Sequence, residues 1–543
     1  MLQPAPAGLV AAGAEPRSSP DLPIRPAATA VTAFVGRTLK GPVDEPVPIG
    51  SFAQFVQVFG GIWQPAPLSY AVEQYFENGG QRAIIVRVAS GGQAPTLDLP
   101  AGDQVFLLAG LHPGSREYLR ASVDYDSIEA ADDTLFNLVV QRVRAPGSEL
   151  VEQQEIFRRL SLSPASVRYA DAVLAGSQLV RVAGPLPSQR PDLTPGDGAR
   201  ALVGYVACNA DGDDGAALCD YDLIGSQSLR RGLFALERGP AFNFLSLPPL
   251  ARDRDVGMSA LVVAARYCRQ RHAMLLVDPP QSWRDAGQAL QALPNWAFHS
   301  SDALMFYPRI AASDRLRGRT EVFASGGAAA GLMARADAAG RHWWTTDPAE
   351  LPLRSSLLPA HEVTASQRRQ FGQHGVNVFR YEVLRGEAAL SARTLGGGLA
   401  AGGQLRSLTA RRLLLWIKAS LEQGTRWVSQ CHNEPSVREQ ACAQVLAFLE
   451  GVAAEGGFRA AGLGDERFVI CDERLNGPVE IARGEFHLLY GVSTQQVGRF
   501  ETWLMTHRAG GSLVRPVSVN RFATSGQQVE LEIETAILRG LTR

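Results

Sequence analysis

The stretch from Ser407 to Val428, SLTARRLLLWIKASLEQGTRWV, has the clearest helical periodicity in the chain. Its apolar residues recur at intervals of three and four, the spacing of one face of an α-helix, and its charged residues fall on the other side. Gly424 is suited to end the helix, because glycine reaches the left-handed conformation of a C-cap. The apolar face consists of Leu413, Trp416, Ile417 and Leu421, and the charged side of Arg411, Arg412, Lys418 and Glu422.

Other residues of this stretch indicate that it lies in a hydrophobic core. Leu414 and Leu415 widen the apolar stripe, so we expect the helix to be covered on more than one face. Trp427 and Val428 follow the glycine and begin a predicted strand. The sequence thus indicates a core helix that leads into a core strand.

A second patterned region lies near the N-terminus, in TAFVGRTLKGPVDEPVPIGSFAQFVQVFGG (32–61) and PLSYAVEQYFENGGQRAIIVRV (67–88). It predicts a buried strand at 31–36, then a helix that Ser51 caps and Gly60 with Gly61 ends. A second helix begins at Ser69, and an apolar strand follows at 83–88. These elements form one compact α/β half-module.

The middle of the chain contains two regions with different predicted secondary structure. Residues 96–200 have short apolar runs typical of strands, with one amphipathic helix expected at 152–160. Between 242 and 307, apolar strands alternate with helices of about ten residues, which predicts a parallel sheet covered on both faces. In the small-residue helix 325–337, Gly327 and Gly331 permit close approach of another backbone.

Composition excludes several classes of protein. Of the 543 residues 20% are charged and the formal net charge is −1, so no overall basic field favours nucleic acid. No apolar run approaches 18 residues, and the first residues lack the pattern of a secretory signal, so we expect neither membrane insertion nor export by that route. The six cysteines lack the spacing of a zinc site, and no sequence motif predicts a metal or cofactor.

Catalytic motifs are also missing from the sequence. The sequence contains neither a phosphate-binding loop motif nor a nucleophile elbow motif. The acidic run 209–215 does not match the residue pattern of a calcium-binding loop, and we interpret it as a polar turn. Asp278 and Asp302, beside predicted parallel strands, are the best-placed carboxylates for acid–base chemistry. Their alternative roles are to cap the helix after Pro280 and to open a strand from solvent. An enzyme that uses the 242–307 sheet is therefore the least favoured hypothesis.

Several stretches together resemble the contractile tail sheath family of bacteriophage tails and related bacterial injection machines. Besides the two ends of the chain and the Asn433-Glu434-Pro435 that follows the central helix, the similarity is collinear over residues 29–491. It includes GLFALERGPAFNFLSLPP (232–249), RQRHAMLLVDPP (269–280), SDALMFYPR (301–309) and SGGAAAGLMARADAAGRHWW (325–344). These motifs are structural and not catalytic.

The resemblance implies a multidomain α/β (α+β) chain with a discontinuous inner domain. Residues 29–95 and 351–508 would form the inner sheath domain, with a β-rich insertion at 96–200 and an α/β insertion at 201–350. Residues 1–28 and 509–543 would be extended terminal arms. The core of the inner domain would then contain Phe34, Phe55, Phe59, Tyr75, Leu413, Trp416, Ile417 and Trp427.

The same resemblance implies a mechanical function and no enzymatic activity. Sheath subunits form six-membered rings that stack helically around an inner tube, then shorten to drive the tube through a target envelope. The expected partners are further copies of the chain, the tube protein, and baseplate and tail terminator or cap proteins, with no nucleic acid and no direct membrane insertion. Assembly would take place in the bacterial cytoplasm, and the product would be a phage tail or a tail-like particle. A non-contractile terminator, cap or collar is the alternative.

In this family terminal arms add strands to neighbouring subunits. QQVELEIETAIL (527–538) alternates apolar and acidic residues, as a half-buried strand does, and such a strand must pair with some sheet edge. It is the predicted exchanging arm, with residues 500–506 as the alternative. The candidate inter-subunit residues are Val529, Leu531, Ile533, Phe500 and Trp503.

Overall fold

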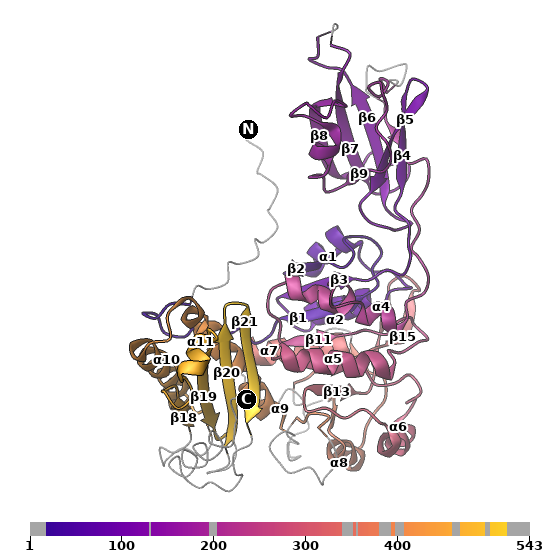
Figure 1. The fold of residues 1–543 in the computed structure, drawn as a ribbon. Helices are drawn as coiled ribbons and strands as arrows, with labels where there is room; N and C mark the ends of the chain where they lie inside the picture. Colours follow the sequence, from indigo (N-terminus) through magenta and orange to yellow (C-terminus); the bar gives the residue numbers. More distant parts are fainter. Residues whose placement is uncertain are drawn as a thin grey trace, which may run out of the picture.

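The computed structural model describes residues 18–129, 132–194, 204–338, 351–354, 357–379, 392–396, 407–458, 467–494 and 500–517. They form three bodies: a central α/β body, a β-rich domain that projects from it, and a C-terminal body beside it (Figure 1). The fold is thus mixed α/β and multidomain, as expected.

The α/β body is built on a seven-stranded sheet of order β17-β13-β12-β11-β1-β3-β2. All neighbours are parallel except β2, which runs antiparallel to β3. Its central strands are buried along their whole length. Since successive side chains point to opposite sides of a strand, both faces of the sheet are covered. The bounds are β1 (Thr32–Gly36), β2 (Pro46–Ile49), β3 (Ala83–Arg87), β11 (Phe244–Ser246), β12 (Met274–Val277), β13 (Ala303–Tyr307) and β17 (Val376–Val378).

Helices cover both faces of this sheet. One face packs against α1 (Phe52–Phe59), α2 (Pro67–Glu77) and α7 (Gly326–Ala338). The other packs against α5 (Met258–Gln270), α6 (Ala286–Ala292) and α8 (Ala365–Gln373). The caps of α1 agree with the sequence: Ser51 Oγ accepts a hydrogen bond from Gln54 N, and Gly60 adopts the left-handed conformation.

The glycines of α7 bring two helices into backbone contact. A Cβ built at Gly327 would lie 2.1 Å from the carbonyl oxygen of Ala71 in α2, and one at Gly331 would lie 2.4 Å from that of Tyr75. Both distances are far inside van der Waals contact, so neither position accepts a larger residue without movement of a helix. The close approach expected from the small-residue pattern is present.

The β-rich domain consists of two antiparallel sheets of order β10-β6-β7-β8 and β4-β5-β9 around one apolar cluster. The prediction of an amphipathic helix at 152–160 is wrong, because Val151–Ser161 forms strand β8, which pairs with β7 along its length. Strand pairing here overrides a local helical spacing. The strands are β4 (Thr96–Ala101), β5 (Gln104–Gly110), β6 (Tyr118–Asp124), β7 (Leu135–Val143), β9 (Val180–Val182) and β10 (Val206–Ala207).

The C-terminal body has an antiparallel sheet of order β18-β19-β20-β21. One of its faces packs against the central helix α9 (Leu408–Gly424) and against α10 (Pro435–Ala454). The prediction that a strand begins at Trp427 is wrong, since Arg426–Gln430 forms a short 3-10 helix. Trp427 and Val428 are nevertheless buried in the core. The strands are β18 (Arg467–Ile470), β19 (Phe486–Val492), β20 (Glu501–Arg508) and β21 (Gly511–Val517).

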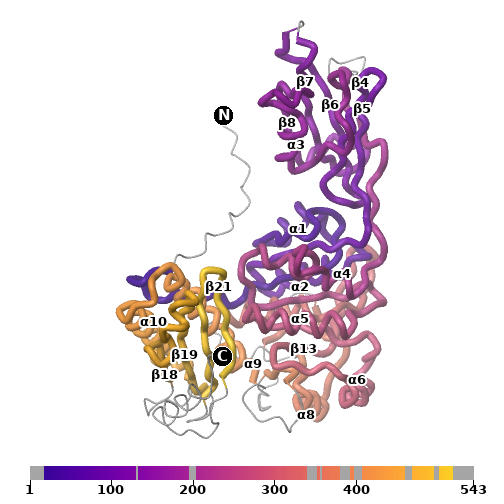
Figure 2. Tube along the Cα trace, viewed as in Figure 1, coloured from indigo at the N-terminus to yellow at the C-terminus, as the bar shows by residue number. Residues whose placement is uncertain are grey.

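The strand pairing corrects the expected grouping of segments. Strand β1 pairs with β11 on one side and with β3 on the other, so residues 29–95 share one sheet with the βαβ segment that was assigned to a separate insertion. Figure 2 shows these early and middle segments side by side, with the C-terminal body next to them on one side. The local sequence does not encode which parallel strands become neighbours, so the grouping could not be read from periodicity.

Candidate functional site at the central helix

Helix α9 is the element through which the parts of the molecule meet. Leu408 and Leu415 belong to the core of the α/β body. Leu413, Ile417 and Leu421 belong to the core of the C-terminal body. A third contact comes from residues 18–28, which we call the N-terminal strap. The 17 residues of α9 are therefore shared between two cores, which is why its apolar stripe is wider than one face.

Polar side chains on α9 and at its C-cap lie along one side of the helix, where some contact the α/β body and others the C-terminal body. Arg411, Lys418, Glu422 and Thr425 are spaced by seven, four and three residues, and so lie on one side of the helix. We call these four residues the polar seam. Arg411 and Lys418 are only 7% and 8% exposed, which corrects the interpretation of the charged side as the outer side of the helix.

The first contact of the polar seam joins α9 to the sheet of the α/β body. Asp302, immediately before β13, is fully buried and accepts hydrogen bonds from Arg411 Nε at 3.0 Å and from Arg269 Nε at 2.9 Å. Burial alone would raise the pKa of this carboxyl, but the two guanidinium groups hold it below its usual value. Asp302 is thus the buried anchor of an inter-body ion pair and does not open to solvent.

Lys418 occupies the middle of the polar seam. Its Nζ lies 4.2 Å from the centroid of the Trp503 ring on β20, within the range of a cation–π contact. Burial, together with the nearby Arg411, lowers its pKa to about 7, whereas Glu501 and Asp302 oppose the shift. The amine is therefore poised between its two protonation states near neutral pH.

The far end of the polar seam contains two histidines. His272 Nε2 lies 2.9 Å from Glu422 Oε2, linking the turn after α5 to α9. Thr425 Oγ1 lies 2.6 Å from the Leu421 carbonyl oxygen and forms a hydrogen bond of 2.8 Å with His507 Nε2. Burial lowers the pKa of His507 to about 4, which keeps this imidazole neutral.

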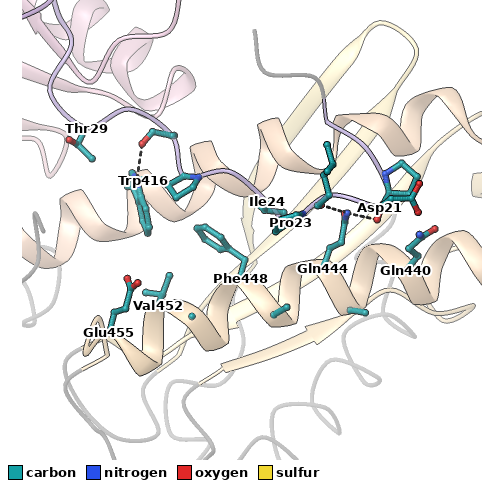
Figure 3. Close-up of a pocket in the computed structure, with 17 residues that line it drawn as sticks. Asp21, Pro23, Ile24, Thr29, Trp416, Gln440, Gln444, Phe448, Val452 and Glu455 are labelled. Carbon is teal, nitrogen blue, oxygen red and sulfur yellow. Dashed lines mark hydrogen bonds between the residues drawn. The ribbon is translucent and has the colours of Figure 1, made fainter.

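The N-terminal strap fastens α9 from its other side. Ala27 N donates to Ser420 Oγ at 2.9 Å, and Trp416 Nε1 donates to the Ala27 carbonyl at 2.9 Å. Farther along, Gln444 Nε2 on α10 donates to strap carbonyls, including that of Leu22 at 2.8 Å (Figure 3). Between the strap and α10 lies an apolar groove of about 740 Å³, with Phe448 and Val452 in its lining (Figure 3).

This arrangement suits a joint between two rigid bodies. Each body has its own apolar core, and α9 contacts the α/β body both through the apolar side chains of Leu408 and Leu415 and through the ion pairs of Arg411 and Arg412. The polar seam therefore lies where two apolar cores share one helix.

Asp278, the other carboxylate considered for acid–base chemistry, has a structural contact. Asp278 Oδ1 accepts from Gly326 N at 2.6 Å, so this carboxylate caps α7 and not the helix after Pro280. Burial raises its pKa to about 6. Across the described ranges, no group of three His, Cys, Asp or Glu side chains is arranged to hold a metal. Nor does any helix in those ranges have the length and apolarity needed to cross a bilayer.

The predicted core residues are all buried, but in two cores. Phe34, Phe55, Phe59 and Tyr75 lie in the α/β body, and Leu413, Trp416, Ile417 and Trp427 in the C-terminal body. Among the strand candidates, Trp503 is buried in β20, which pairs with β19 and β21 within the same chain, and Phe500 packs on Phe468. Val529, Leu531 and Ile533 lie outside the described residues.

Sequence reasoning missed the partners of the polar seam. Arg269, Asp302 and His507 come from segments far from α9 in the chain, so no local pattern connects them to it. The sequence feature that could have indicated the seam is the spacing of seven residues between Arg411 and Lys418, on a helix whose other positions are mostly apolar. Charges at such positions indicate a buried polar line when every other face of the helix is covered.

Comparison with solved structures gives matches along nearly the whole chain. The sheath tail protein of Listeria innocua matches with a TM-score of 0.55 and 10% sequence identity, covering 91% of this chain and 96% of that chain. A chain in the structure of the anti-feeding prophage baseplate in its contracted state gives 0.50 and 16%, covering 91% and 96%. A chain in the contracted PVC sheath complex, of an extracellular contractile injection system, gives 0.48 and 15%, covering 91% and 95%. No family model and no curated protein matches the sequence.

Proposed function

We propose that this chain, which has the fold of contractile sheath proteins, is the structural subunit of a contractile tail sheath. The observation that carries the proposal is the match to the Listeria sheath tail protein over nearly the full length of both chains. Within the assembly, copies of the chain would form stacked hexameric rings around an inner tube, and shortening of the stack would drive the tube through a target envelope. Its role is structural and not enzymatic.

The internal architecture supports this mechanical role. Contraction requires bodies that stay rigid while their mutual orientation changes, because packed cores switch between discrete arrangements and do not deform continuously. The chain supplies two separate cores joined by one shared helix and a polar seam. We infer that the polar seam is a joint that adjusts when rings slide past one another.

Partners and location follow as parts of the same proposal. The subunit would assemble in the bacterial cytoplasm and bind copies of itself, a tube protein, baseplate proteins and a terminator or cap protein. Residues 527–538 remain the proposed exchanging arm, since β20 is already paired on both sides in its own chain. A strand that joins a free sheet edge gains main-chain hydrogen bonds that survive rotation of the bodies.

Electron microscopy of the purified full-length protein tests the function. We expect long hollow tubes of stacked six-membered rings. Single rings that never stack would favour a non-contractile terminator, cap or collar, and a dispersed monomer under all assembly conditions would reject both roles.

The arm is tested separately. Deleting residues 524–543 should leave a folded chain, with unchanged far-ultraviolet circular dichroism, that no longer forms long tubes. Full-length tubes from the truncated chain would reject residues 527–538 as the exchanging strand while leaving the sheath role intact.

A further inference from the structure

The N-terminal strap crosses the joint between the two bodies. Its side chain at Ile24 lies in the core of the C-terminal body, and the main chain of Ala27 is hydrogen-bonded to α9 through both its N–H and its carbonyl. The next residue already contacts the α/β body, where Asn243 Nδ2 donates to the Ala28 carbonyl at 2.6 Å. Asn243 Oδ1 then accepts from Val31 N at 3.0 Å. The strap therefore connects the two bodies at a second place besides α9.

One side chain clamps the N-terminal end of the strap. Gln444 Nε2 on α10 lies 2.8 Å from the carbonyl oxygens of Ser19 and Leu22 and 2.7 Å from that of Pro20 (Figure 3). Its Oε1 accepts from Trp427 Nε1 at 2.9 Å. Since an indole N–H only donates, this contact fixes the amide with its NH₂ group toward the strap.

Between this clamp and α9 the strap is loosely packed. Within residues 18–28, all of which the structure describes, Ile24 is the one buried residue. The groove of about 740 Å³ lies between the strap and α10, so the strap makes no continuous apolar contact with that helix. Segments with few buried apolar contacts open at a lower free energy than packed cores. The strap can therefore leave the C-terminal body while both cores stay folded.

We propose that the strap is a brace that tension releases. While Gln444 holds it, the strap ties the C-terminal body to the α/β body, and a pull on residues 1–17 strips residues 18–27 from the C-terminal body and frees the joint at α9. The contacts of Gln444 break first, then that of Ile24, because this is their order along the chain. Release ends at Ala28, which Asn243 holds on the α/β body.

Within the proposed sheath, the pull would come from a neighbouring copy that binds residues 1–17. This source of tension rests on the proposed function. The release itself is a property of the single chain, so its test needs no assembly.

Optical tweezers test the release on the full-length chain. One handle is attached at the N-terminus and the other at Cys431, which is exposed after the 3-10 helix of the C-terminal body. We expect a first, reversible extension of at most about 35 Å, the extended length of residues 18–27, before either core unfolds. The remaining cysteines that are not buried are changed to serine: Cys208, Cys219 and Cys442.

Gln444→Glu is the test variant, because it removes the donor to the strap carbonyls and keeps an oxygen for Trp427 Nε1. It should raise the rate of release at a given force about tenfold, the factor expected for the loss of one or two hydrogen bonds. Gln440→Glu is the matched control, since it places the same charge one turn earlier on the same wall of the groove and should leave the rate unchanged.

Ile24→Ala should also speed release, and its comparison with Gln440→Glu decides if Gln444→Glu does not fold. Equal release rates in the test variant and the control would overturn the proposal. So would a first event that already unfolds a core.

The brace is tested separately by the distance between the bodies. Spin labels are placed on Cys431 and on Cys219, which is exposed at the start of α4 (Asp220–Ile224) in the α/β body. Double electron–electron resonance should give a broader distance distribution when Ile24→Ala and Gln444→Glu are combined than in Gln440→Glu. The same distribution in both would show that the strap does not brace the joint. Neither experiment uses tubes, so both outcomes are independent of the sheath role.

Discussion

At the scale of single residues, the buried charges are the most informative feature. Asp302 has no exposed surface and binds two arginines from different elements. Removing one partner of a buried ion pair leaves the other charge uncompensated, which costs far more than loss of an exposed pair. Asp302 thus contributes to holding α9 against the sheet, together with the Arg412–Asp337 ion pair and the apolar contacts of Leu408 and Leu415.

Asp302→Asn should lower the free energy of unfolding by about 3–5 kcal/mol, because Arg411 keeps its buried position and loses its counter-charge. Chemical denaturation followed by tryptophan fluorescence measures the change. Asp472→Asn is the matched control, since Asp472 pairs with Arg474 in a half-exposed site and its loss should cost less than about 1 kcal/mol. Equal effects of the two changes would contradict the anchoring role of Asp302.

His507 should make stability depend on pH in the acid range. Burial lowers its pKa to about 4 in the folded chain, against about 6.5 when unfolded, so the unfolded chain takes up the proton first. Stability should therefore fall by roughly 3 kcal/mol as the pH decreases from about 6.5 to about 4. His507→Gln should reduce this dependence in thermal melts between pH 4 and 7, leaving the part due to His112, whose pKa burial also lowers to about 4. An unchanged slope would assign the whole dependence to other groups.

At the scale of elements, backbone approach decides how helices and strands are placed. Helix α7 lies against α2 because Gly327 and Gly331 have no side chains. In β8, by contrast, pairing with β7 makes a strand of a stretch with helical spacing. Local pattern sets what an element can be, and its neighbours decide what it becomes.

Gly327→Ala should destabilise the chain by about 3 kcal/mol or more, since the new methyl group meets the Ala71 carbonyl and not a flexible side chain. Gly451→Ala in α10 is the matched control: nothing lies within 4 Å of the added atom, and alanine is the better helix former by up to about 1 kcal/mol. Calorimetry should show melting temperatures that move in opposite directions. A loss of similar size in both variants would show that the α2–α7 contact is not the cause.

At the scale of the whole molecule, a buried network fixes the β-rich domain to the α/β body. Arg87 at the end of β3 donates to the carbonyls of Gly41 and Pro113, both at 2.7 Å. Glu117, at the base of the domain, accepts from Arg142 Nε at 2.8 Å and from Gly41 N at 3.3 Å. The domain should therefore move together with the α/β body, unlike the C-terminal body across its seam.

Glu117→Gln should loosen this attachment without unfolding the domain itself, because it removes the charge that Arg142 binds and leaves the apolar cluster intact. Limited proteolysis with mass spectrometry should show faster cleavage in the connections at 88–95 and 208–218. Glu149→Gln is the control, since its carboxylate is 94% exposed and lies 3.9 Å from Arg120. Equal cleavage rates in both variants would show that Glu117 does not hold the domain.

The sequence by itself determined the class and the main elements of this protein. Periodicity located the helix after Ser51, the helices at 258–268 and 325–337, the central helix and the apolar strands of the parallel sheet, because these patterns follow from the geometry of one element. The structure places the four helices at 52–59, 258–270, 326–338 and 408–424. The caps at Ser51 and Gly60 and the role of Gly327 are local in the same sense.

Only the tertiary structure decided which segments share a core and where the charges of the central helix go. The pairing of β1 with β11 joins residues more than two hundred positions apart, and Asp302 reaches Arg411 across more than a hundred. Such contacts depend on how whole elements pack, and their free energies come from partners that no local window contains. For that reason Arg411 and Lys418 look like a solvated face in the sequence and form a buried seam in the fold.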